Sequence, residues 1–263
     1  MTYARRHLDV ATFTTGRATG ELKVLELGAG RTLAVPLVLA SFGVARQVST
    51  DVSSLVRREL VIDAAQRLRS WGHAGLDAVA DAGPTTPLVE VLDRVGIAHR
   101  VLVPGELTGV VDSSVDLVHS TSVLEHVDLQ SFGPLLRDVH RVLEPTGILS
   151  SIVDYKDHYS YGDPSIGPYH FLQHSPERWR WCNPPSHHQN RLRHDEMMEV
   201  IRGHGFDVRV IDVIGGDPAS DEWFRHATLA PEFRGRDPEA LLTSEAHIVG
   251  AKVADPADAD QAG

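Results

Sequence analysis

KVLELGAGRTLAVPLVLASFGVARQVSTD, residues 23–51, decides the fold of this chain. Its first five residues, 23–27, form a short, mainly apolar run that is followed by glycine, which predicts a buried strand. A mainly apolar helix is expected over 31–42, and a second short strand over 47–50. Glycines at a strand-to-helix turn let the backbone approach a ligand without an intervening Cβ atom. Asp51 follows the second strand, where its carboxylate is placed to accept hydrogen bonds from a ribose diol.

Strands and helices continue to alternate along the rest of the chain. The patterns predict helices over 53–70, 88–95, 129–143 and 194–204, and strands over 98–103, 115–119, 147–153, 207–214 and 246–253. This alternation favours a Rossmann-like, doubly wound α/β fold with a mostly parallel sheet. We expect a single domain over 1–253. The small, acidic tail at 254–263 is expected to be disordered.

The composition of the chain excludes several classes of protein. Of its 263 residues, 42% are hydrophobic, which is enough to bury a core. No apolar run approaches the ~20 residues of a membrane-spanning helix, and the N-terminus lacks the apolar segment of a secretory signal. We therefore expect a cytoplasmic protein with no membrane partner. A net charge of −11 disfavours a nucleic-acid partner, and the one cysteine, Cys182, excludes an internal disulfide.

Two nucleotide cofactors compete for the glycine turn at 28–30. A dinucleotide fingerprint needs a small third residue that packs the helix on the strand, and Leu33 occupies that position. This departure disfavours an NAD-dependent oxidoreductase. A noncatalytic binding protein on a related scaffold would show a degraded turn, whereas the acidic and glycine positions are all present here.

Three segments in order resemble motifs of the class I S-adenosylmethionine-dependent methyltransferases. The turn ELGAG at 26–30, followed by Asp51, resembles their first motif. Residues 112–127, DSSVDLVHSTSVLEHV, are similar to the segment D-x-S-F-D-V-V-x-S-x-x-V-L-E-H-V of that family. RVLEPTG at 141–147 is similar to the element R-V-L-K-P-G-G. The resemblance implies an antiparallel hairpin of the last two strands at the edge of the sheet.

The resemblance also implies S-adenosylmethionine as cofactor and a set of contacts for it. Gly28 and Gly30 would lie under its methionine portion, and Glu26 would hold the amino nitrogen. Asp51 would bind the ribose, and Ser120 and His126 would lie at the methionine end. For His126, a structural hydrogen bond is the alternative. The family's Gly-Asp pair after the third strand is replaced by Gly105 and Glu106, so either Glu106 or backbone packing would hold the adenine.

Residues 155–194 break the alternation and gather seven of the sixteen aromatic residues. Large aromatic side chains prefer burial, so this segment is expected to pack over the open end of the sheet as a substrate-binding cap. It resembles the D-H…S-I…N-F-L…W…Y-Q-N-R-L-R pattern of bacterial methyltransferases from polysaccharide and natural-product pathways. The acceptor is therefore expected to be a small molecule, with a sugar or secondary-metabolite hydroxyl favoured over nitrogen or carbon.

Methylation of a hydroxyl benefits from a base, and the cap offers imidazoles that act near neutral pH. His158 is the first candidate and His187 the second, although a histidine satisfied by a structural hydrogen bond is the alternative for each. The candidates for acceptor binding are Tyr161, Tyr169, Asn190 and Arg191. A structural role competes for the tyrosines and the arginine. No metal is predicted, because Asp154, Asp157 and His158 lack an identifiable further ligand. A homodimer is compatible with the sequence.

Overall fold

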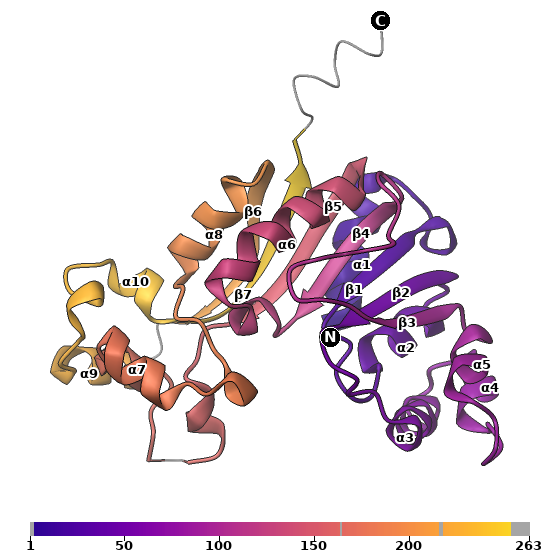
Figure 1. The fold of residues 1–263 in the computed structure, drawn as a ribbon, viewed down its shortest axis with the longest axis horizontal. Coiled ribbons are helices and arrows are strands. Elements are labelled where there is room, and N and C mark those ends of the chain that lie inside the picture. Colours follow the sequence, from indigo (N-terminus) through magenta and orange to yellow (C-terminus); the bar gives the residue numbers. More distant parts are fainter. Residues whose placement is uncertain (1–2, 164, 216–217, 254–263) are drawn as a thin grey trace, which may run out of the picture.

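The computed structural model describes residues 3–163, 165–215 and 218–253. Seven strands form one sheet in the order β3-β2-β1-β4-β5-β7-β6 (Figure 1). They are β1 (Lys23–Leu27), β2 (Arg46–Asp51), β3 (Ile97–Val101), β4 (Val115–Thr121), β5 (Leu143–Asp154), β6 (Phe206–Gly215) and β7 (Thr243–Lys252). β1 to β5 pair in parallel, and β7 runs antiparallel between β5 and β6. The predicted α/β fold with an antiparallel C-terminal strand is confirmed. The predicted tail at 254–263 lies outside the described residues.

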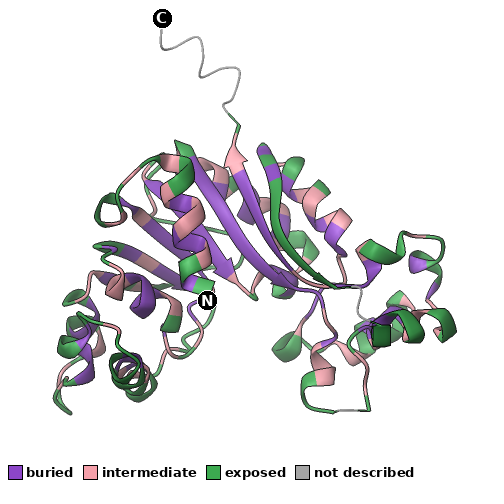
Figure 2. Ribbon diagram, turned by 180° about the vertical axis from the view of Figure 1, so that it is seen from behind, coloured by how far each residue is buried: buried purple, intermediate pink, exposed green. Residues whose placement is uncertain are grey.

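Helices cover both faces of the sheet. They are α1 (Tyr3–Thr15), α2 (Ala34–Ser41), α3 (Arg58–Ser70), α4 (Asp77–Ala80), α5 (Leu88–Asp93), α6 (Leu129–Val142), α7 (Pro176–Cys182), α8 (His194–Arg202), α9 (Pro218–His226) and α10 (Pro238–Leu241). Successive strand residues point to opposite faces, so β1 sends Val24 into a core with α1 to α3 and Leu25 into a core with α6 and α8. Figure 2 shows the central strands buried and the edge strand β6 largely exposed.

Several helix boundaries differ from the sequence predictions. The helix expected over 31–42 begins only at Ala34, because Leu33 has a left-handed backbone with φ of 53°. The helix expected over 53–70 begins at Arg58, and α4 lies between the helices expected over 53–70 and 88–95. The sequence analysis missed α1 entirely. None of the helices in the described ranges has the length and apolarity needed to cross a membrane.

A third hydrophobic cluster lies beyond the carboxyl end of β5. It joins Tyr169, Phe171, Leu172 and Trp179 to residues near the C-terminus: Ala230, Phe233, Leu241 and Leu242. We call residues 155–193 and 218–242 the outer lobe, which contains α7, α9 and α10 (Figure 1). The cap expected over 155–194 thus shares its core with a second segment that the sequence analysis did not assign.

Candidate active site

The glycine turn after β1 is fixed to the end of β2 by backbone hydrogen bonds. Gly28 N and Ala29 N both donate to Thr50 O, at 2.8 and 2.9 Å. The Asp51 carboxylate accepts from Gly30 N at 3.0 Å, so the predicted glycine and acidic positions meet. A Cβ atom on Gly28 would lie 2.3 Å from Val123 Cγ2, and its φ of 80° also favours glycine.

Glu26 is a buried carboxyl group at the end of β1. It accepts a hydrogen bond from Ser49 Oγ on the neighbouring strand. Burial raises the pKa of Glu26 to about 8, although the Ser49 hydrogen bond acts in the opposite direction. An adjacent ammonium group would favour the ionised carboxylate. The site around Glu26 is therefore suited to a cationic group.

A tight turn at 122–127 follows β4 and borders the glycine turn through Val123. Ser122 N donates to Ile152 O at 2.8 Å, which ties the turn to β5. The Asn190 carboxamide donates to Leu124 O at 2.8 Å and to Val127 O at 2.9 Å. Asn190, predicted to bind the acceptor, thus holds this turn in place from the outer lobe.

Three histidines that are distant in sequence meet beside this turn. The ring centroids of His126 and His158 are 4.8 Å apart, and those of His158 and His187 are 6.5 Å apart. His126 Nδ1 lies 2.7 Å from His188 O, so this nitrogen donates to the carbonyl. Burial is the main cause of the lowered pKa of His126.

Asp154 joins this cluster from the end of β5. Its Oδ2 lies 3.6 Å from His158 Nε2 and accepts a hydrogen bond from the Tyr161 hydroxyl. Burial raises the pKa of Asp154, but the contacts with His158 and Tyr161 outweigh it and the net pKa is lowered. The predicted residues Tyr161 and His158 therefore share one carboxylate.

Glu125 is a site residue that the sequence analysis missed. Only 2% of its surface is exposed, and neither carboxyl oxygen has a hydrogen-bond partner among the described residues. Burial raises its pKa well above the usual range. Glu125 stands in the sequence Leu-Glu-His at 124–126, but its proximity to His158 depends on how β4 and β5 pack.

Comparisons with known proteins bear on this geometry. The family described as "Methyltransferase domain" matches residues 88–151, which include β4, the turn at 122–127 and α6. No curated protein matches the chain. YcgJ from Bacillus subtilis is a similar solved structure, with a TM-score of 0.50 and 15% identity over 95% of this chain and 100% of that chain. The chain is thus similar to a methyltransferase domain over residues 88–151, and it shares the fold of YcgJ.

Two further structures share the fold of this chain. The 1,6-didemethyltoxoflavin-N1-methyltransferase of Burkholderia thailandensis has a TM-score of 0.50 and 16% identity, covering 95% of this chain and 78% of that chain. The [4+2]-cyclase SpnF has a TM-score of 0.52 and 17% identity, covering 95% and 82%. Because these two proteins are named for different reactions, the shared fold does not by itself fix the chemistry.

S-Adenosylmethionine is the cofactor that the resemblance to methyltransferases implies, and the glycine turn fits it. Gly30 has a φ of 61°, and no atom lies within 4 Å of the position that its Cβ would take, so the backbone is open to a ligand. Glu26 offers a buried carboxyl group to an ammonium. Asp51 is partly exposed at the end of β2. An amino acid and a ribose diol are the groups that such a surface can hold.

Three of the predicted site residues make structural contacts. Ser120 is fully buried and donates to Ser151 Oγ at 2.9 Å. Tyr169 is also buried, and its hydroxyl donates to Leu242 O at 2.6 Å. Arg191 donates to Phe171 O at 3.0 Å and pairs with Glu232 at 2.8 Å. Tyr169 and Arg191 therefore hold the outer lobe together, which is the alternative that the sequence left open.

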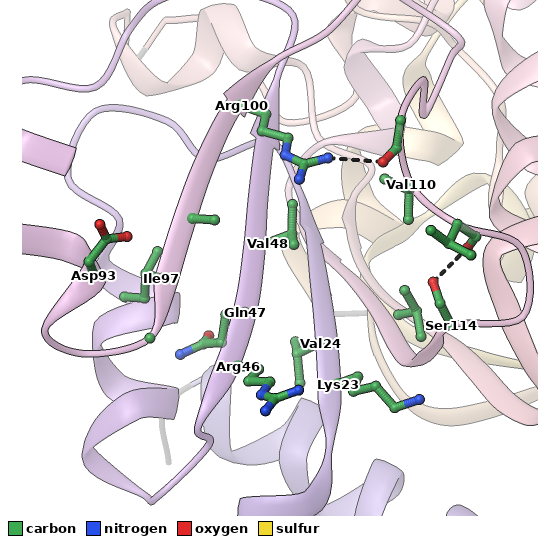
Figure 3. Close-up of a pocket in the computed structure, with 15 residues that line it drawn as sticks. Lys23, Val24, Arg46, Gln47, Val48, Asp93, Ile97, Arg100, Val110 and Ser114 are labelled. Atoms are coloured by element: carbon green, nitrogen blue, oxygen red, sulfur yellow. Dashed lines mark hydrogen bonds between the residues drawn. The ribbon is translucent and has the colours of Figure 1, made fainter. Parts of the chain in front are cut away.

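A hollow of about 450 Å³ lies at the other end of the sheet (Figure 3). It is lined by the first residues of β1 and β2, including Lys23 and Arg46, and by Arg100 of β3, which donates to Gly109 O at 3.2 Å. Ligands of doubly wound sheets bind at the carboxyl ends of the strands. The glycine turn and the histidine cluster lie at those ends, so the candidate active site is placed there and not at the hollow.

Proposed function

We propose that this methyltransferase transfers a methyl group from S-adenosylmethionine to a hydroxyl group of a small molecule, such as a sugar or a secondary metabolite. The observation that carries the proposal is the cluster of His126, His158 and His187 at the turn 122–127, whose Val123 borders Gly28. A hydroxyl nucleophile must lose its proton during transfer, whereas a neutral amine acceptor has less need of a base. An imidazole can accept that proton near neutral pH.

On the donor side, the bound cofactor supplies a methyl group on a positively charged sulfur. Asp51 is proposed to accept hydrogen bonds from the ribose hydroxyls, and Glu26 to pair with the amino group. Gly28 and Gly30 supply backbone without side chains beneath the methionine portion. Together these contacts would orient the methyl group toward the histidine cluster, and orientation of this kind can contribute about 7–11 kcal/mol.

On the acceptor side, His158 and His187 are the proposed proton acceptors. The His158 ring contacts His126 and Tyr161, with centroid distances of 4.8 and 5.4 Å. His187 is exposed and lies 4.8 Å from the ring of Tyr159. The exposed ring of Tyr161 could stack on a sugar or a planar acceptor.

The first test is calorimetric titration of the full chain with S-adenosylmethionine, followed by an acceptor screen of glycosides and phenols. We expect saturable binding that weakens at least about 10-fold in Asp51→Ala, because two ribose hydrogen bonds are lost. Asp93→Ala is the matched control, since this exposed carboxylate lies at the amino end of β3. Binding of NAD(H) in place of S-adenosylmethionine, or methylation of nitrogen or carbon acceptors alone, would refute the proposal.

A further inference from the structure

The Glu125 carboxyl group is buried without a hydrogen-bond partner among the described residues. Buried polar atoms are almost always hydrogen-bonded, yet both carboxyl oxygens of Glu125 lack a partner among the described residues. The backbone amides of Glu125 and Asp154 lie near this carboxyl group without reaching hydrogen-bond geometry. An ionised carboxylate in such a place needs a cation, because an isolated buried charge is strongly disfavoured.

Two imidazoles stand beside this carboxyl group. Glu125, His126 and His158 each offer one ligand atom, and these three atoms lie within 4.8 Å of one another. Metal–ligand bonds of about 2.0–2.2 Å place neighbouring ligand atoms about 3 Å apart, so side-chain rotations would close the site. His126 is exposed, so an ion can reach the site from solvent, whereas Glu125 is buried away from solvent.

Each of the two histidines offers a ring nitrogen to a metal ion. His126 Nδ1 donates its proton to His188 O, which leaves the Nε2 lone pair free. Ligating histidines commonly direct the other ring nitrogen to a carbonyl in this way. His158 Nε2 lies 3.6 Å from Asp154 Oδ2, too far for a hydrogen bond, and it has no hydrogen-bond partner among the described residues.

We propose that Glu125, His126 and His158 bind one divalent transition-metal ion that holds the oxygen of the acceptor. Two imidazoles and one carboxylate suit Zn²⁺, Mn²⁺ or Fe²⁺ better than Mg²⁺ or Ca²⁺. Three protein ligands leave positions open, so an acceptor with two neighbouring oxygens, such as a vicinal diol or a catechol, would chelate the ion.

This proposal rests on the proposed function and changes the role of one residue in it. His158 becomes a ligand, and His187 remains to accept the proton. The acceptor O–H bond breaks with its proton going to His187, the new O–CH₃ bond forms, and the C–S bond breaks with its electron pair staying on sulfur. The ion would stabilise the alkoxide that develops on the acceptor oxygen.

The experiment measures metal binding directly, without any need for turnover. The full chain is treated with EDTA, dialysed, and titrated by calorimetry with Zn²⁺ and Mn²⁺, with Mg²⁺ for comparison; bound metal is then counted by elemental analysis. We expect one equivalent of Zn²⁺ or Mn²⁺ in the wild type. Glu125→Gln, His126→Ala and His158→Ala should each weaken binding by at least about 100-fold.

Two variants serve as controls for nonspecific histidine binding. His187→Ala should keep the metal and lose methyl transfer, whereas His170→Ala, in the neighbouring His170–His174 pair, should keep both. His126→Ala tests the site even if a change at buried Glu125 disturbs folding, because His126 is exposed. The proposal would be overturned if the folded wild type bound no metal ion, or if the three ligand variants bound it as tightly as the wild type. Titration with S-adenosylmethionine separately reports on the donor site.

Discussion

The proposed donor and acceptor halves of the candidate active site are built in different ways. The donor half lies within 26 consecutive residues, 26–51, and backbone atoms of the glycine turn and β2 hold it together. The acceptor half assembles side chains from the turn at 122–127, the end of β5 and the outer lobe. A donor site made of backbone is insensitive to most side-chain changes, whereas an acceptor site made of side chains can be altered one residue at a time.

The largest expected effect comes from Arg193, which ties the outer lobe to the sheet. It is fully buried and donates to Tyr155 O, Leu241 O and Thr243 O at 2.6, 2.6 and 2.7 Å. Arg193→Met should lower the free energy of unfolding by about 3–5 kcal/mol, because three buried carbonyls lose their donors. Urea unfolding measures the change.

The exposed Arg180 in α7 provides the control for this substitution. Arg180→Met should change the free energy of unfolding by no more than about 0.5 kcal/mol. If the two halves are built as described, folded Arg193→Met protein will keep its affinity for S-adenosylmethionine while amide exchange in the outer lobe accelerates. If amide exchange accelerated equally in both halves, the two halves would not be built independently as described.

A smaller effect is expected at Gly28, where the two halves touch. Gly28→Ala would set a Cβ atom 2.3 Å from Val123 Cγ2 at a φ of 80°. We expect a loss of about 2–3 kcal/mol in unfolding free energy and weaker cofactor binding, because both the turn at 28–30 and Val123 must shift. Gly30→Ala has the same backbone strain with open space around it, so its unfolding cost should be about 1 kcal/mol lower. Equal costs would show that the contact with Val123 is unimportant.

The smallest effect concerns pH and a buried histidine network behind the acceptor half. His7 of α1 and His247 of β7 both hydrogen-bond to Ser150 at 2.8 Å, and His119 of β4 has no partner among the described residues. Burial lowers the pKa of His119 to about 3 and that of His247 to about 4. The positive charge of Arg6 further lowers the pKa of His7 and His247.

Because these pKa values are lowered, the free energy of unfolding decreases as the pH drops through a definite window. Below pH about 6.5 the unfolded chain takes up protons that the folded protein excludes, so each histidine costs stability as pH drops toward its folded pKa. Between pH 7 and 5, His119 alone should account for about 1–2 kcal/mol. His119→Leu should remove that share of the loss in urea unfolding, and His226→Leu, an exposed control, should leave the loss unchanged. A wild-type stability that is flat over this range would contradict the account.

The sequence predicts the donor half well because its determinants are local. All seven strands are anticipated by short apolar runs and turn residues, and Gly28, Gly30 and Asp51 meet as expected. What it misses lacks a local signal. α1 was not assigned at all, and residues 218–242 become part of the outer lobe only through contacts with Tyr169 and its neighbours.

For the acceptor half, the sequence predicts which residues take part but not how their side chains are arranged. His126, His158 and His187 are all named from sequence, but their spacing of 32 and 29 positions gives no distance between rings. Asn190 and Arg191 have the chemistry of ligand-binding residues and are used to hold backbone carbonyls. A polar side chain in a predicted site serves binding or architecture according to which partners the fold supplies.

The shared core of the outer lobe has a consequence for redesign. Residues 155–193 and 218–242 each contribute half of one hydrophobic cluster, so neither segment can be transplanted alone into a related scaffold. A chimera carrying only the first would expose Tyr169, Phe171 and Trp179 to water. Exchange of acceptor preference between such proteins therefore calls for paired grafts, with the strands β6 and β7 kept as the fixed frame that brings the two pieces together.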